Sequence, residues 1–226
     1  MAKNKRLLIL AAMPLQATEL RTIFSDRPQS SRRKLESPPM LRPHGWDLPS
    51  ARAELRGGEL IRVIEQGRLA AELYRDGTFI VEAQIHQDFL AWSDKTDSQF
   101  HPLALIELIV NFTRFYRSIL DDFLTPPNDI QFRVELRNMH LGNRKTTLSS
   151  GTVETHWPLG GGEKEAPSDS WTKGIIVAAS FDEDRLAYAL AKELYVWFGH
   201  SEEAIPYVTD TLEGKSIDVK RIQTIH

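Results

Sequence analysis

The stretch RLAAELYRDGTFIVEAQI, residues 68–85, decides the fold class of this chain. Its two halves are strand-like runs, and Asp76-Gly77 lies between them. This pair favours a type I′ turn, because both central positions of that turn need positive φ. The sequence therefore predicts a hairpin with a two-residue loop, in which Tyr74 lies opposite Phe79 on one face of a sheet.

A long helix is expected after the hairpin. The run HPLALIELIVNFTRFYRSILDDFL, residues 101–124, has apolar residues at helical spacing, and Pro102 is well placed to start the helix. A helix with so much apolar surface is mostly buried. The residues predicted to face the sheet are Leu105, Ile109, Phe112, Tyr116 and Ile119. The predicted polar stripe consists of Glu107, Asn111, Arg114, Ser118 and Asp121 or Asp122.

The remaining periodic segments indicate an α+β fold. Residues 50–85 have the pattern of a β-meander, and IQFRVELRNM, residues 130–139, alternates as a strand does. A second helical run covers residues 182–199. The predicted fold is an antiparallel β-meander packed against one long and one shorter helix, with a short N-terminal strand-helix appendage.

Three parts are expected along the chain. Residues 1–25 join a short apolar run to a segment with helical spacing, which predicts the strand-helix appendage. Residues 26–49 contain five prolines and no periodicity, as a linker does. Residues 50–226 form the predicted α+β accessory domain, with a mobile loop near residues 141–170, where three successive glycines occur.

The composition limits the cellular compartment that we expect and the kinds of site that the chain can form. The 226 residues carry a formal net charge of −3, so bulk charge predicts no polyanionic partner. The absence of cysteine excludes a disulfide framework, a zinc–thiolate site and a cysteine nucleophile. No apolar run approaches the length of a membrane span, and Met13-Pro14 interrupts the N-terminal apolar run before it reaches the length of a secretory signal. We therefore expect a cytoplasmic protein with no membrane association.

The sequence contains no catalytic or metal-binding signature. No two histidines are three or four residues apart, as ligands on one helix face would be. Residues 149–151 lack the G-x-S-x-G pattern of a serine nucleophile. The glycines at 160–162 lack the preceding strand and the lysine of a phosphate-binding loop. The sequence therefore predicts no catalytic residue, no metal ligand and no cofactor.

One set of basic residues is a candidate binding site for nucleic acid or for a partner protein. Its members are Arg114 and Arg117 on the long helix, Arg133 and Arg137 on the alternating strand, and Arg144 and Lys145 in the next loop. If the helix packs beside the strand, these side chains form a cationic patch suited to phosphate oxygens. The alternative is a solvated sheet face, because Arg133, Glu135 and Arg137 alternate in sign.

Five motifs resemble those of a known bacterial region. They are WDLP at 46–49, GGELIRV at 57–63, ELYRDGTFIV at 72–81, DFLAW at 88–92 and PLALIELIVNFTRFYRSIL at 102–120. Residues 46–139 resemble the accessory region that follows the AlbA-type (Schlafen-like) DNA-binding domain in many bacterial proteins. The AlbA-type domain itself is absent here. The opening RLLILAAMP, residues 6–14, is similar to the first strand and turn of TIR-like or caspase-like bacterial effector modules.

This resemblance implies an accessory module that works with a partner, and it carries over no catalytic residues. We therefore expect a non-catalytic accessory or sensor subunit of a bacterial defence or regulatory complex. It would bind a partner protein in a hetero-complex, with nucleic acid as a further candidate ligand. The alternative is an enzyme or nucleotide-sensing domain whose site is too dispersed to be recognised in the sequence.

Overall fold

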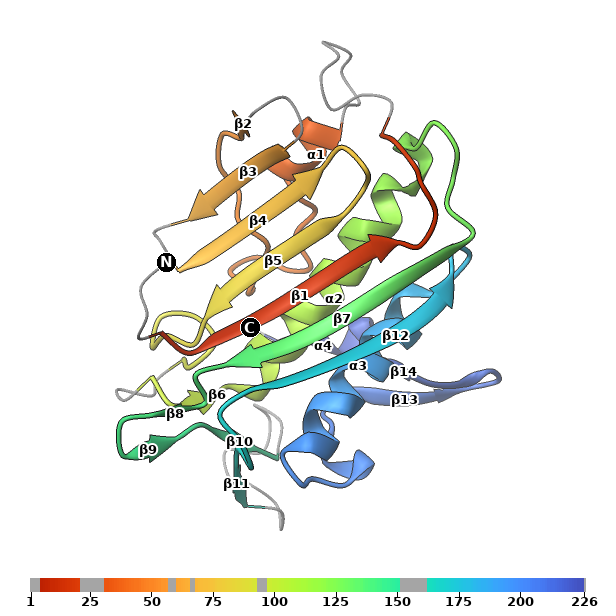
Figure 1. Cartoon of the computed structure of the whole chain (residues 1–226). Coiled ribbons are helices and arrows are strands. Elements are labelled where there is room, and N and C mark those ends of the chain that lie inside the picture. Colours follow the sequence, from red (N-terminus) through yellow and green to blue (C-terminus); the bar gives the residue numbers. More distant parts are fainter. Residues whose placement is uncertain are drawn as a thin grey trace.

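An antiparallel sheet of seven strands forms one layer of the computed structural model, and helices cover one face of this sheet (Figure 1). The structure describes residues 5–20, 31–56, 60–65, 68–92, 97–150 and 162–225. The strand order is β12-β7-β1-β5-β4-β3-β2. The bounds are β1 Leu7–Pro14, β2 Glu54–Arg56, β3 Leu60–Glu65, β4 Leu69–Tyr74, β5 Phe79–Gln84, β7 Asp129–Arg137 and β12 Trp171–Ala178. The predicted α+β class is confirmed.

The helices and the short strands complete the described chain. The helices are α1 Ser31–Glu36, α2 Pro102–Ile119, α3 Glu183–Trp197 and α4 Val219–Gln223, with 3-10 turns η1 Leu120–Asp122 and η2 Glu202–Ala204. The short strands are β6 Gln99–Phe100, β8 His140–Leu141, β9 Arg144–Lys145, β10 Thr147–Ser149, β11 Glu163–Glu165, β13 Val208–Thr211 and β14 Gly214–Ile217. Within the described ranges, no helix has the length and apolar character that crossing a membrane requires.

The large sheet combines a meander with a central N-terminal strand. β2, β3, β4 and β5 are neighbours both in sequence and in the sheet, so the predicted meander is confirmed. β1 lies between β5 and β7 and pairs with both, and even Ile9 and Ala11, on its solvent-side face, are buried. The prediction of an N-terminal appendage is therefore wrong, since β1 joins the two halves of the sheet. Residues 15–20 are not helical, and residues 21–25 lie outside the described ranges.

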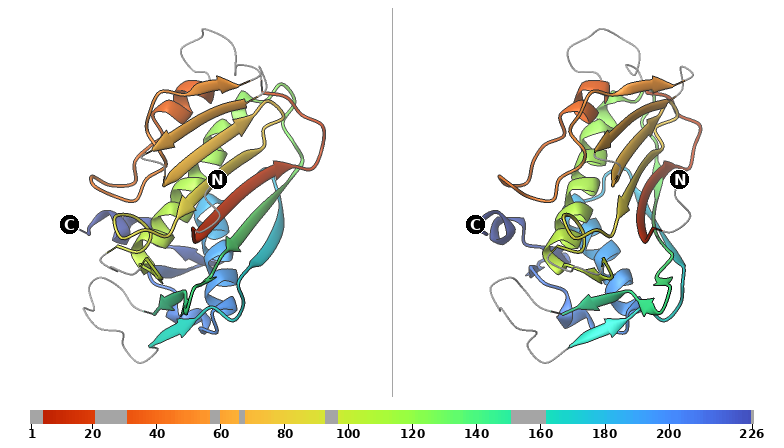
Figure 2. Two further views of the ribbon diagram at one scale, coloured as in Figure 1. Left: turned by 60° about the vertical axis from the view of Figure 1, so that its left-hand side comes forward. Right: turned by 90° about the vertical axis from the view of Figure 1, so that its left-hand side faces the viewer.

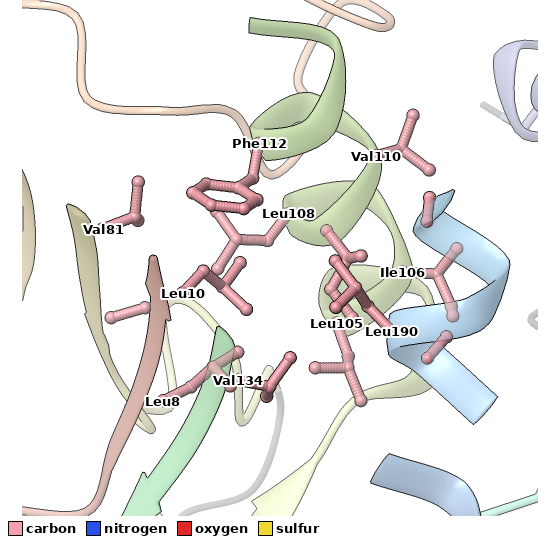
Figure 3. Packing of buried hydrophobic residues seen from close by; sticks show 14 of the residues in the cluster. Leu8, Leu10, Val81, Leu105, Ile106, Leu108, Val110, Phe112, Val134 and Leu190 are labelled. Carbon is pink, nitrogen blue, oxygen red and sulfur yellow. The ribbon is translucent and has the colours of Figure 1, made fainter. Parts of the chain in front are cut away.

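α2 is the centre of the core. It packs between the sheet and α3, and Figure 3 shows its apolar side chains facing those of β1, β5 and β7. The labelled residues are Leu8, Leu10, Val81, Leu105, Ile106, Leu108, Val110, Phe112, Val134 and Leu190. The five α2 residues predicted to face the sheet are all fully buried, which confirms that part of the helix pattern. The helix ends at Ile119 and continues as η1 rather than as regular helix to residue 124.

The hairpin between β4 and β5 differs from the predicted one. Leu73 pairs with Phe79, so the loop has three residues and Tyr74 lies opposite Thr78. Gly77 has the positive φ that was predicted, at +85°, whereas Asp76 does not. The Asp76 carboxylate instead accepts a hydrogen bond from the Thr78 amide at 2.8 Å, as aspartate does in turns. The predicted pairing of Tyr74 with Phe79 is wrong because one extra loop residue shifts the register.

The segment predicted to be a linker is part of the folded structure. Within it, residues 31–36 form α1, and Leu35, Leu41, Trp46 and Leu48 are buried. These apolar side chains join the same core as α2, so the segment covers apolar surface instead of bridging two domains. The predicted mobile loop is only partly within the described ranges, and its first ten residues, 141–150, contain short strands.

Candidate functional site

The helices cover one face of the large sheet, and the other face carries no helix (Figure 2). Because Phe132 and Val134 face the core, Arg133 and Arg137 point the opposite way. Glu135 lies between them and contacts both, at 2.5 Å from Arg137 Nε and 3.7 Å from Arg133 Nη2. Its hydrogen bond raises the pKa of Arg137. This arrangement matches the solvated sheet face that was the alternative interpretation of the pattern.

The other four predicted residues lie elsewhere. Arg114 of α2 makes a two-pronged contact with Asp184 of α3, at 2.9 and 2.8 Å, and this hydrogen bonding raises the pKa of Arg114. Arg117 donates to the carbonyl of Ala179. Arg144 and Lys145 belong to β9, and Lys145 contacts Glu165 at 3.0 Å. The fold therefore separates the two arginines of α2 from those of β7, because α2 packs on the face of β7 from which the strand arginines point away.

A different site is formed on the helix side, where a pocket of about 450 Å³ lies between two loops. We call it the Trp92 pocket. Residues 37–50 form one wall and residues 88–92 form another, and Arg68 also lines the pocket. Two apolar side chains of its lining are exposed to solvent, Met40 by 70% and Trp92 by 50%. Exposed methionine and tryptophan at a concave surface are typical of binding sites.

Buried polar groups of α2 hold the first wall in place. Glu107, which is fully buried, accepts hydrogen bonds from Arg42 Nε at 2.6 Å and from the Trp46 amide at 2.8 Å. Asn111 donates to the Trp46 carbonyl at 3.2 Å and to Asp47 Oδ1 at 3.1 Å. We call these contacts the Glu107 network. Glu107 and Asn111 of the predicted polar stripe are thus buried beneath this loop. They lie one helical turn apart, so both can bind the same loop.

Trp46 connects the two walls of the pocket. Its indole Nε1 donates to the carbonyl of Phe89 at 3.0 Å, and its ring lies 4.7 Å from that of Trp92 and stacks on His101 at 5.5 Å. Gly45 precedes it, and a Cβ atom at Gly45 would lie 2.8 Å from Glu107 Oε2. The sequence places glycine here because the backbone must approach a buried carboxylate closely.

The second wall is fixed by backbone hydrogen bonds. The amides of Phe89 and Ala91 both donate to the carbonyl of His86, and the His101 amide donates to the carbonyl of Leu90. Leu90 and Ala91 are fully buried, so the segment is anchored immediately before Trp92. The exposed Trp92 therefore projects from a supported backbone.

The pocket lining includes charged side chains of both signs. Asp47 and Asp88 contribute two carboxylates, and Arg68 contacts Asp88 at 3.4 Å. Burial lowers the pKa of His101 to about 4, so this ring behind the two tryptophans is neutral at pH 7. Burial raises the pKa of Glu107, whereas the Trp46 amide and Arg42 favour its charged form. The charged side chains of the described lining are thus Asp47, Asp88 and Arg68.

A second hollow, of about 720 Å³, lies beside α1 and β2. Its described lining consists of Arg32, Arg52, Ala53, Glu54 and Arg56. Arg32 contacts Glu36 at 3.2 Å, and Arg56 contacts Glu54 at 3.2 Å. No ion pair of Arg52 is observed among the described residues, so this hollow has an excess of positive charge.

The Trp92 pocket has the features of a binding site. Within the described ranges, no group of three or more histidine, aspartate or glutamate side chains is placed to hold a metal ion. The hydroxyl of Ser50, a serine of this lining, donates a hydrogen bond to the carbonyl of Glu36 and not to a base. The chemistry on offer is therefore apolar contact, aromatic contact and carboxylate pairing. An enzyme with a dispersed site stays an untested alternative.

Sequence reasoning missed this pocket, although it noted the motifs that form it. WDLP supplies Trp46 and Asp47, and DFLAW supplies Asp88 and Trp92. The usable signal was the polar pair Glu107 and Asn111 on a helix that the sequence predicts to be mostly buried, because buried polar groups require hydrogen-bond partners. Their partners lie more than 60 residues away, so no local pattern identified them.

The fold and the pocket define a two-layer α+β protein with a pocket on its helix side. Comparison with models of known protein families gives no match, and comparisons with curated proteins and with solved structures give none either.

Proposed function

We propose that this chain is a binding subunit that docks a partner protein at the Trp92 pocket. The observation that carries the proposal is the exposure of Trp92 and Met40 at a pocket whose walls are otherwise anchored. A large apolar side chain is exposed to water at a free-energy cost of about 1.5–3 kcal/mol relative to full burial. Partner binding would bury both side chains and recover that free energy.

The support beneath the pocket favours tight binding. The Glu107 network and the Trp46–Phe89 hydrogen bond hold both walls before any ligand arrives. A preorganised site loses little conformational entropy on binding. Tryptophan is also the residue type most enriched among the side chains that dominate binding energies. Trp92 is accordingly the expected centre of the interface.

The pocket chemistry indicates the kind of partner segment. An apolar side chain of the partner fits against Trp92 and Met40, and a neighbouring lysine or arginine pairs with the exposed carboxylate of Asp88. The positive charge of such a lysine or arginine is also attracted to the face of the Trp92 ring. The partner would therefore present an apolar anchor beside a basic residue.

The motif resemblance supports the same function. WDLP and DFLAW, two of the motifs that resemble the accessory region of AlbA-type bacterial proteins, meet at this pocket. If this chain and those accessory regions bind partners in the same way, similar motifs are expected at the binding surface. We therefore propose that the chain serves as an accessory or sensor subunit of a bacterial defence or regulatory complex in the cytoplasm.

The test compares tagged variants expressed in the native host. Proteins and nucleic acids that co-purify with wild type are quantified, and the same is done for Trp92→Ala and Met40→Ser. Leu212→Ser is the matched control, because Leu212 is a fully exposed apolar residue that does not line the pocket. We expect one protein whose recovery falls with both pocket variants and is unchanged in the control.

The affinity is then measured with that purified protein by calorimetry. Loss of a central tryptophan is expected to weaken binding about 30-fold or more, which corresponds to about 2 kcal/mol. Equal affinity of wild type and Trp92→Ala for that protein, with both proteins folded, would rule out the pocket as the docking site. Recovery of nucleic acid alone would favour the second candidate.

The second candidate is an anionic ligand, such as a nucleic-acid backbone, at the hollow lined by Arg32, Arg52 and Arg56. Its support is the excess of arginine, which suits phosphate oxygens. The measurement is the salt dependence of binding to a duplex of arbitrary sequence. Arg52→Ala is expected to reduce the slope of log K against log salt by about one unit. An unchanged slope would exclude a phosphate contact at Arg52.

A further inference from the structure

One border of the large sheet is a long strand with a free edge. β12 pairs with β7 along all eight of its residues, and it is the last strand of the sheet. Among the described residues, no backbone hydrogen bond reaches its outer side. In Figure 2 the sheet ends at β12, and α3 with the β13–β14 hairpin lies behind it on the helix side. The outward N–H and C=O groups of β12 are therefore open to another strand.

β12 also has few of the features that usually prevent edge pairing. Its sequence WTKGIIVA has no proline, and its register with β7 has no bulge. The one charged residue, Lys173, is paired with Glu193 of α3 at 3.3 Å. The opposite border is different, because β2 has three residues and two of them, Glu54 and Arg56, are charged. Of the two borders of the large sheet, as far as the structure describes them, the β12 border is the one suited to strand addition.

The edge is complementary to itself. When two copies of WTKGIIVA run antiparallel with Ile175 opposite its own equivalent, Gly174 of each strand lies opposite residue 176 of the other. Ile176 is 59% exposed, and Gly174 has no side chain to oppose it. A large side chain that faces a small residue packs without leaving a void. In this register Lys173 faces Val177 of the partner subunit, so the lysines do not repel one another.

We propose that β12 pairs with β12 of a second copy of this chain, about a two-fold axis through Ile175. The two sheets then form one continuous sheet, and each copy uses the same surface. A two-fold axis satisfies both free edges in one interface and repeats the contact between Ile176 and the small Gly174 twice. This interface is separate from the Trp92 pocket, so the two proposals stand or fall independently.

The absence of cysteine makes the register directly testable. Residues directly opposite in an antiparallel pair have Cα atoms about 4.5–5.5 Å apart, which is within the range of a disulfide. Ile175→Cys should therefore give a disulfide-linked dimer under mild oxidation, seen on non-reducing gels. Thr172→Cys is the matched control, because its equivalents would lie about 20 Å apart along the strands. A mixture of Thr172→Cys and Ala178→Cys should again form a cross-linked dimer, because position 172 of one copy lies opposite position 178 of the other in this register.

A charge exchange tests the same interface without oxidation. Ile176 and its equivalent are diagonal neighbours about 7–8 Å apart, so Ile176→Lys and Ile176→Glu should each sediment as monomers. An equal mixture of the two variants should sediment as a dimer, as wild type should. A monomeric wild type at every concentration, a monomeric mixture, or equal cross-linking at positions 172 and 175 would each overturn the proposal.

Discussion

Replacement of Gly77 by alanine tests how the β4–β5 turn is joined to the core. Gly77 has φ +85°, and a Cβ atom there would lie 2.2 Å from Cζ of Phe123. Phe123 is almost fully buried beside η1, so its ring has little space to move. Two separate penalties are therefore expected, one from the backbone conformation and one from the overlap.

The matched control is Gly199, which follows α3. It also has φ +85°, but no atom lies within 4 Å of a Cβ placed there. Gly199→Ala should therefore show the conformational penalty alone, about 1 kcal/mol. Gly77→Ala adds the cost of overpacking, about 1–3 kcal/mol, which gives about 2–4 kcal/mol in total. The entropy that alanine removes from the unfolded chain is the same for both variants and cancels in the comparison.

The free energies of unfolding are measured by urea titration, with tryptophan fluorescence as the signal. A third variant, Phe123→Leu, makes room near Gly77, so its combination with Gly77→Ala should be less destabilised than the sum of the two changes. Equal losses for Gly77→Ala and Gly199→Ala, within about 0.5 kcal/mol, would refute the argument. That result would show that the turn does not pack on Phe123.

Three further predictions concern the core and the support of the Trp92 pocket. Ile109→Ala should lower the free energy of unfolding by about 2–5 kcal/mol in urea, because Ile109 is fully buried and the change leaves a cavity; a loss under about 0.5 kcal/mol would mean that this helix face is exposed. Glu107→Gln should cost about 3–5 kcal/mol at pH 7, since Arg42 would keep its buried charge without a counter-charge; a loss below about 1 kcal/mol would contradict the role of the Glu107 network. His101 binds a proton near pH 6.5 in the unfolded chain and only near pH 4 in the folded one, so its contribution to stability is complete above pH 6.5 and is lost as the pH falls to 4. Between pH 7 and pH 4 wild type should therefore lose about 1–2 kcal/mol more than His101→Asn, a variant that can still cap α2, and parallel pH profiles would disprove the burial effect.

The sequence by itself determined the elements whose signals are local. Alternation along residues 130–139 predicted β7, and helical spacing predicted both α2 and its buried residues. Glycine at position 77 predicted a turn with positive φ, because few other residues adopt that conformation. These predictions succeeded because hydrophobic periodicity fixes which side of an element is buried.

Periodicity does not say what covers the buried side, and only the tertiary structure decided that. β1 was predicted to belong to an N-terminal strand-helix appendage, yet it pairs with β7 more than 100 residues later and is an interior strand of the sheet. Segment 31–49 had no periodicity, yet it packs on α2 because Glu107 and Asn111 bind its backbone.

The basic residues show the same limit. Arg114 and Arg133 were expected to share a patch, but α2 packs on the face of β7 opposite to Arg133. Side chains alternate across a strand, so one register choice places every strand arginine away from the helix. That choice depends on which face buries Phe132, and this in turn is set by long-range packing against α2.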